Sequence, residues 1–159
     1  TPKQRTRDMD TVLKHALACT SIFIPHTVID SCGINTATEL AVKKMLNNIA
    51  VKPELVIMDG NFRFSPGVSF KSVIKGDCRS ISIASASIIA KVTRDSIMCR
   101  VESAFPGYGF AVHKGYGTRK HMEAIASLGL CAIHRKSYEP ARSMLEAQGI
   151  LFDEDNRLQ

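Results

Sequence analysis

The chain contains no long hydrophobic run and no recognisable export signal. None of its apolar stretches approaches the ~18 consecutive residues of a membrane-spanning helix, and no apolar stretch follows the charged opening TPKQRTRD. Both absences argue against a membrane or secreted protein, so we expect a cytoplasmic location and no membrane partner. Internal repeats and low-complexity tracts are also absent from the sequence.

Closely spaced cysteine pairs are lacking as well. The five cysteines are an odd number and include no C-x-x-C pair; they are Cys19, Cys32, Cys78, Cys99 and Cys131. A zinc site needs clustered ligands, and a disulfide scaffold needs a dense, even set. We therefore expect reduced, buried thiols.

The size and composition are those of a single globular domain. The 159 residues, of which 45% are hydrophobic and 23% charged, can form one core, and we treat 1–159 as one domain. The net charge of +6 is concentrated between Lys71 and Arg142, where twelve Lys/Arg oppose five Asp/Glu. Such localised positive charge is typical of proteins that bind polyanions, although a solvated basic face would look the same.

Hydrophobic periodicity predicts an α/β domain with crossover connections. We expect helices over 7–20, 35–49, 80–105 and 143–148, a helix capped by Thr118 that ends at Gly129, strands over 21–24 and 54–58, and an extended segment over 68–74. The run ELVIM, 54–58, has the composition of a buried parallel strand.

Two aspartates follow predicted elements at positions where ligands often bind. Asp59 ends the 54–58 strand, and Asp77 follows Lys75-Gly76 just before the long helix. In open α/β sheets, ligands gather beyond the carboxyl ends of the strands, where two carboxylates can hold a divalent metal against phosphate. The alternatives are that Asp59-Gly60 is an ordinary turn and that Asp77 caps the helix at Ser80.

The tract HKGYGT, 113–118, combines glycines with a cation and an aromatic ring. Glycines let the backbone approach a phosphodiester closely, Lys114 supplies a positive charge, and Tyr116 offers a flat face to a sugar or base. A plain turn with solvated bases remains the alternative for this tract taken alone.

Taken together, these strings resemble ribonuclease HII, the type 2 ribonuclease H. The matching segments are VIMDGN (56–61), KGD (75–77), SIASASIIAKVTRD (82–95), FPGYGFAVHKGYGT (105–118), HMEAIASLG (121–129) and IHRKSYEP (133–140). The resemblance implies a ribonuclease H-like α/β fold, with a mixed sheet flanked by helices. It also implies endonucleolytic cleavage of RNA–DNA hybrids and of duplex DNA that contains ribonucleotides, with Mn²⁺ or Mg²⁺ as cofactor.

The resemblance also assigns roles to individual residues. Asp59 and Asp77 match the family's metal-binding, catalytic aspartates, and Tyr116 matches the tyrosine that stacks on the sugar near the RNA–DNA junction. Further nucleic-acid contacts are expected from Lys114, Thr118, Lys75 and His113. We expect a monomer.

Other polar residues of the matching strings are expected to have structural roles. Asp95 lies four residues after Lys91 on the predicted long helix, a spacing that favours an ion pair over metal binding. For His113, His121 and His134 we expect phosphate contact, capping or packing, because hard Mg²⁺ or Mn²⁺ prefers oxygen ligands.

The sequence departs from the family at its start. Family members open with a strand bearing an Asp-Glu pair, followed by Gly-Arg-Gly and D-S-K-x-L motifs, and none of these occurs here. The expectation is an α/β fold with its N-terminal strand missing, exposed apolar surface, and little or no activity for these 159 residues alone. The alternatives are a nucleic-acid-binding remnant that does not cleave and an unstable product without function.

Overall fold

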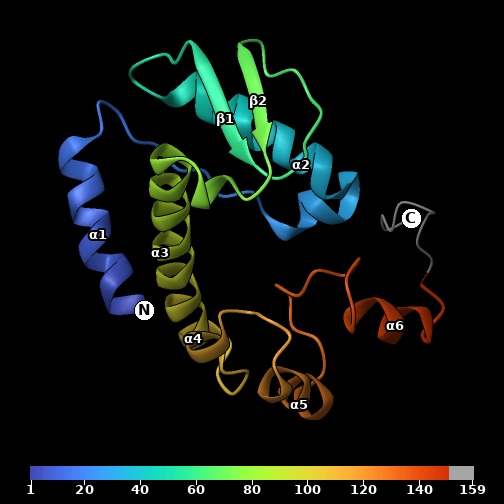
Figure 1. The fold of residues 1–159 in the computed structure, drawn as a ribbon. Helices are drawn as coiled ribbons and strands as arrows, with labels where there is room; N and C mark the ends of the chain where they lie inside the picture. The colour runs from blue at the N-terminus through green and yellow to red at the C-terminus, as the bar shows by residue number, and fades with distance from the viewer. Residues whose placement is uncertain (151–159) are drawn as a thin grey trace. The chain divides into compact units, whose positions relative to one another are not determined.

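The computed structural model describes residues 1–150, which contain helices and a small parallel sheet (Figure 1). In chain order the elements are α1 (Pro2–His15), α2 (His26–Asn48), β1 (Leu55–Asp59), β2 (Ser69–Val73), the 3₁₀ helix η1 (Gly76–Cys78), α3 (Ile81–Ala104), α4 (Phe110–His113), α5 (Arg119–Leu128) and α6 (Ala141–Glu146). The predicted α/β class is confirmed.

The chain divides into two compact units, each described by itself. The first comprises Thr1–Phe23 and Thr38–Thr93, and therefore contains α1, both strands, η1 and the first half of α3. Of the described residues, the second comprises Ile24–Ala37 and 94–150, which include α4, α5 and α6. The assignment of 1–159 to one domain remains a prediction.

β1 and β2 form a parallel pair whose arrows lie side by side in Figure 1, in register from Leu55 opposite Ser69 to Asp59 opposite Val73. The strand predicted at 54–58 is confirmed within one residue. Its middle residues are half-buried and its ends exposed, so the expectation of a fully buried strand was wrong. The extended segment predicted over 68–74 contains β2.

The strand predicted over 21–24 does not form. Across residues 1–150 the sheet consists of β1 and β2 alone, and the segment before Pro25 is irregular. An apolar run becomes a strand only when a neighbouring backbone satisfies its N–H and C=O groups. The apolar composition of this run was therefore insufficient evidence for a strand.

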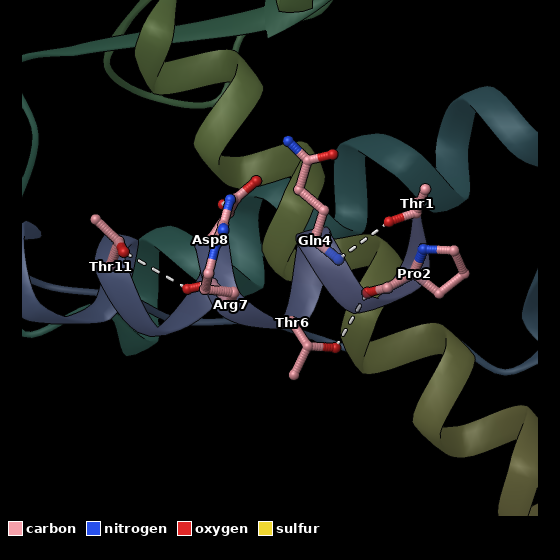
Figure 2. Close-up of polar contacts among 7 residues, drawn as sticks. All are labelled: Thr1, Pro2, Gln4, Thr6, Arg7, Asp8 and Thr11. Atoms are coloured by element: carbon pink, nitrogen blue, oxygen red, sulfur yellow. Dashed lines mark hydrogen bonds and ion pairs between the residues drawn. The ribbon is translucent and has the colours of Figure 1, made fainter.

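α1 begins earlier than its apolar periodicity predicts. Pro2 occupies the first turn, and the Thr1 hydroxyl accepts a hydrogen bond from the Gln4 backbone N–H at 3.3 Å, which caps the helix (Figure 2). Ala16 is already extended, so the helix expected over 7–20 lies instead over 2–15. The Thr-Pro pair was the start signal that the periodicity argument did not use.

α2 is two helical segments joined at a glycine. Gly33 has φ 76° and ψ 164°, values that interrupt the helix between a short first segment and the longer segment predicted over 35–49. The short segment begins after Pro25, whose carbonyl accepts from the backbone N–H of Val28 at 3.1 Å. The positive φ explains why the chain has glycine at this position.

The remaining helix ends agree closely with their predicted signals. α3 begins beside Ser80, whose hydroxyl accepts from the Ile83 N–H at 3.5 Å, and it spans nearly the predicted 80–105. Thr118 caps α5, and Gly129 ends it with φ 77°, both as predicted. α6 lies two residues before the predicted 143–148.

The core of the second unit is built around Phe110, which is 2% exposed. The Tyr108 ring stacks on it at 5.3 Å between centroids. Three imidazole rings, those of His113, His121 and His134, lie 5.5–5.8 Å from the Phe110 centroid. An aromatic and imidazole cluster therefore forms the centre of this unit.

A buried carboxylate joins two distant segments of the same unit. Asp30, on α2 and 5% exposed, accepts hydrogen bonds from the backbone N–H of Lys136 and of Ser137, both at 3.0 Å. The Ser137 hydroxyl donates a further bond at 2.6 Å. These three donors satisfy the charge that burial would otherwise leave without partners.

All five cysteines are free thiols, as predicted, but Cys19, Cys78 and Cys99 are exposed. The expectation of burial was wrong for these three because it rested on residue type alone. Several large apolar side chains are also exposed, in line with the expected apolar surface; the most exposed are Leu17, Ile81, Val112, Phe23 and Ile74. No helix within residues 1–150 is both long and apolar enough to span a bilayer.

Candidate nuclease site

The carboxylate of Asp59 is fixed at the carboxyl end of β1 by the KGD segment. Its Oδ1 accepts a hydrogen bond from the backbone N–H of Gly76 at 2.7 Å. The following residue, Gly60, donates its own N–H to the Val73 carbonyl at 3.1 Å, which extends the pairing of the two strands by one residue. Asp59 is therefore oriented by backbone on both sides and remains exposed.

Gly76 permits this close approach because it lacks a side chain. A Cβ at this position would lie 2.6 Å from Cδ1 of Ile83 and 3.4 Å from the Asp59 Cα. Lys75, immediately before it, adopts the left-handed conformation with φ 53°. The turn thus brings η1 against the end of β1, a placement that a bulkier residue at 76 would disturb.

Asp77 is the middle residue of η1, and its side chain is exposed. Within residues 1–150 its carboxylate makes no hydrogen bond or ion pair. The alternative that Asp77 caps the long helix is wrong, because the Ser80 hydroxyl makes the capping bond. Asp77 thus has a solvent-facing carboxylate, and the residue before it, Gly76, is hydrogen-bonded to Asp59.

The HKGYGT loop is held by its own side chains. The His113 imidazole, 7% exposed, bonds through Nε2 to the Tyr108 carbonyl at 2.7 Å and accepts at Nδ1 from the Gly115 N–H at 3.1 Å. Lys114 is in the left-handed conformation, and its Nζ donates to the Ala111 carbonyl at 2.6 Å and to Cys99 Sγ at 2.9 Å. Both side chains therefore contact the protein itself.

Tyr116 is the most exposed aromatic residue of this loop, with 58% of its surface accessible. The Arg94 guanidinium lies over its ring, 4.2 Å from the centroid, and donates through Nη2 to the Lys114 carbonyl at 2.7 Å. Sequence reasoning assigned no role to Arg94, although it stands in the KVTRD string. A guanidinium on one face of the ring leaves the other face for a ligand.

Two further histidines lie behind the loop. The His121 Nδ1 is 3.0 Å from the Tyr116 carbonyl, and its Nε2 is 3.2 Å from Nε2 of His134. Burial lowers the pKa of both imidazoles below the usual 6.5, and the neighbouring His113 lowers them further. These histidines pack within the protein, which is one of the roles expected for them.

The predicted site residues thus fall into two groups. Asp59, Lys75 and Asp77 gather at the end of β1 in the first unit, whereas His113, Lys114, Tyr116 and Thr118 form one loop in the second unit. No cluster of three or more potential metal ligands from His, Cys, Asp and Glu occurs among residues 1–150. Asp95 lies within α3 as expected, and its pairing with Lys91 stays a prediction.

Comparison with solved structures assigns the fold. The structure superposes on the crystal structure of ribonuclease H2 from Pyrococcus horikoshii OT3 with a TM-score of 0.73 over 92% of this chain and 77% of that chain, at 21% identity. The molecule therefore has the fold of a type 2 ribonuclease H.

Sequence comparison narrows this class. The ribonuclease HII family model matches residues 4–141. The chain is 41% identical over 138 residues to the ribonuclease HII of Caldicellulosiruptor bescii, covering 87% of this chain and 67% of that protein. It is 40% identical over 147 residues to that of Geotalea uraniireducens, covering 92% and 68%. The chain belongs to the ribonuclease HII family, a family of ribonucleases, and spans about two thirds of the length of these relatives.

Proposed function

We propose that this protein contributes to a metal-dependent endonuclease that cleaves the RNA strand of RNA–DNA hybrids and incises duplex DNA at embedded ribonucleotides. Family membership supports the ribonuclease class. The observation that carries the catalytic assignment is the 2.7 Å bond from Gly76 to Asp59, which holds one carboxylate beside the segment that bears Asp77. A cytoplasmic, monomeric protein is part of the same proposal.

Asp59 and Asp77 would hold the cofactor, Mn²⁺ or Mg²⁺. Their donor chemistry fits, because both are exposed carboxylates and hard divalent cations prefer oxygen ligands. When bound, such ions lower the pKa of a water molecule and stabilise the leaving oxygen of a phosphodiester. The protein's own contribution is to keep Asp59 oriented through the Gly76 N–H, leaving its second oxygen for the metal.

Tyr116 would stack on the sugar at the RNA–DNA junction. Support comes from its exposure and from Arg94, which covers one ring face and stiffens the ring. Thr118 and Lys75 are exposed and suited to phosphate contact. Lys114 has two of its three ammonium donors engaged within the protein, so it would offer phosphate one donor together with its charge.

His113 has a supporting part in this proposal. The Gly115 N–H can only donate, so Nδ1 of His113 is an acceptor and the proton of the neutral ring lies on Nε2, facing the Tyr108 carbonyl. With both nitrogens engaged, the imidazole would act on nucleic acid by shaping the loop that carries Lys114 and Tyr116.

We further propose that the 159 residues taken alone cleave poorly. Two carboxylates supply less negative charge than a pair of divalent ions requires, and catalytic parts that act as a unit lose most of their rate together. The second candidate function is hybrid binding without cleavage. The concentration of twelve Lys/Arg against five Asp/Glu between Lys71 and Arg142 favours it.

The test compares Asp59→Asn with the unmodified protein, both as the full product of the reading frame and as the 159 residues. In the full product we expect cleavage of a labelled hybrid in Mn²⁺ to fall by about two orders of magnitude or more. Hybrid affinity in EDTA should stay within about two-fold, because Asn keeps the acceptor for the Gly76 N–H.

Asp10→Asn is the matched control, since Asp10 is an exposed carboxylate of α1, and it should cleave normally. Retained cleavage by Asp59→Asn would refute the metal assignment. Binding without cleavage by the unmodified full product, in either metal, would establish the second candidate instead.

A further inference from the structure

A line of hydrogen bonds leads from the 131–134 turn to the proposed sugar-stacking residue. The Cys131 backbone N–H lies 2.9 Å from Nδ1 of His134. His134 Nε2 lies 3.2 Å from Nε2 of His121, and His121 Nδ1 lies 3.0 Å from the Tyr116 carbonyl. The three contacts join residues from the turn, α5 and the HKGYGT loop.

One protonation pattern satisfies every contact in this line. The Cys131 N–H can only donate, so Nδ1 of His134 is the acceptor, and a neutral His134 carries its proton on Nε2. That proton is donated to His121, whose Nε2 must then accept. A neutral His121 therefore has its proton on Nδ1, where it faces the Tyr116 carbonyl.

We propose that His121 and His134 are positioning residues that aim the Tyr116 ring through this chain of two neutral imidazoles. The inference rests on the proposed role of Tyr116 in sugar stacking. The Tyr116 carbonyl also accepts from the Thr118 N–H at 2.7 Å, so His121 occupies its second lone pair. The backbone of Tyr116 is thereby fixed independently of Arg94, which contacts the ring.

The surroundings favour the neutral forms. His121 is 5% exposed, and the His113 ring stacks on it at 4.2 Å between centroids. Positive charge is further disfavoured at His134 by His121, His113 and His26. The backbone of Cys131 acts in the opposite direction on the pKa of His134, and the backbone of Tyr116 does so on the pKa of His121. The uncharged Phe110 ring packs against both histidines, and the uncharged Tyr108 ring packs against His134.

Protonation of either imidazole would disrupt this line of hydrogen bonds. A charged imidazole has N–H donors at both nitrogens, so a proton on Nδ1 of His134 would oppose the Cys131 N–H. A proton on Nε2 of His121 would likewise oppose the Nε2 proton of His134. A charged His121 would keep its Nδ1–H donor to the Tyr116 carbonyl, but its ring would lose the contact with His134 that orients it.

The test uses variants that mimic one ring nitrogen each. The amide nitrogen of Asn reaches the Nδ1 position and that of Gln the Nε2 position, so His121→Asn keeps the donor to the Tyr116 carbonyl and His121→Gln removes it. The readout is the affinity ratio between a duplex with one ribonucleotide and the same all-DNA duplex, measured in EDTA on the full product of the reading frame.

We expect His121→Gln to lower this ratio about 3- to 10-fold, as for the loss of one hydrogen bond, and His121→Asn to lower it less. The effect of His121→Gln should vanish in a Tyr116→Ala background. His134→Leu removes the hydrogen-bond partner of His121 and should behave like His121→Gln. It serves as the second variant if circular dichroism shows that His121→Gln is unfolded.

Two outcomes would overturn the proposal in distinguishable ways. An equal loss with and without Tyr116→Ala would show that the histidines act only through general stability. If Tyr116→Ala leaves the ratio unchanged, the stacking role of Tyr116 itself fails, and the positioning role with it. Cleavage is not measured, so failure of the metal assignment would not affect either result.

Discussion

Gly76 shows how one residue without a side chain determines the geometry of a carboxylate. The KGD string predicted that Asp77 lies near Asp59, since both follow elements that end at the same edge. The bond from the Gly76 N–H to Asp59 could not be predicted, because it depends on the turn that Lys75 makes in the left-handed conformation. A sequence motif gives the order of residues, but it does not give the backbone conformation of a short turn.

We therefore predict that Gly76→Ala destabilises the protein by about 1–3 kcal/mol, the usual cost of overpacking. Its Cβ would meet Cδ1 of Ile83 at 2.6 Å, so adding Ile83→Val, which removes that atom, should recover part of the loss. Urea denaturation measures both changes. Gly117→Ala is the control, because its nearest contact would be Met122 Cε at 4.0 Å. An unaffected Gly76→Ala variant would show that the turn adapts.

Helices with explicit end signals were predicted well, whereas apolar composition predicted one strand correctly, at 54–58, and one wrongly, at 21–24. Thr118 and Gly129 bound α5 as predicted because a capping hydroxyl and a glycine at positive φ are local features. The run before Pro25 failed as a strand because pairing requires another segment. The proposed site follows the same division. Its candidate residues were predicted from motifs and stay predictions, whereas the contact of Arg94 with Tyr116 and that between His121 and His134 depend on tertiary packing.

The α5 cap gives a prediction at this scale. Thr118→Ala should cost about 1 kcal/mol, because the N–H of His121 loses its side-chain acceptor at 3.4 Å. Thr118→Ser keeps the hydroxyl and should cost much less. Thermal unfolding followed by circular dichroism compares the two variants. Equal melting temperatures for Ala and Ser would contradict the capping role.

For the whole molecule, the buried histidines make stability depend on pH. The pKa of His121 and of His134 is lowered below 6.5 in the folded protein, mainly by burial. The unfolded chain therefore binds more protons as pH falls below about 6.5, so stability is complete above that pH and declines beneath it. We predict a falling urea midpoint between pH 7.5 and 5.5.

The pH dependence should be shallower in His134→Gln. This variant keeps a donor at the Nε2 position but has no titrating ring, so one of the two coupled protonations is removed. Urea titrations at five pH values on both proteins would measure the difference. An identical slope in both would show that other groups dominate the acid response.

Asp30 adds a consequence for how the molecule forms during its synthesis. Its partners lie 106 and 107 residues further along the chain. At ribosomal rates of about 5–20 residues per second, roughly 5–20 s separate the emergence of this carboxylate from that of its donors. During that interval Asp30 stays hydrated and its helix cannot dock in final form. The second unit therefore closes late, when the turn at 136–137 arrives.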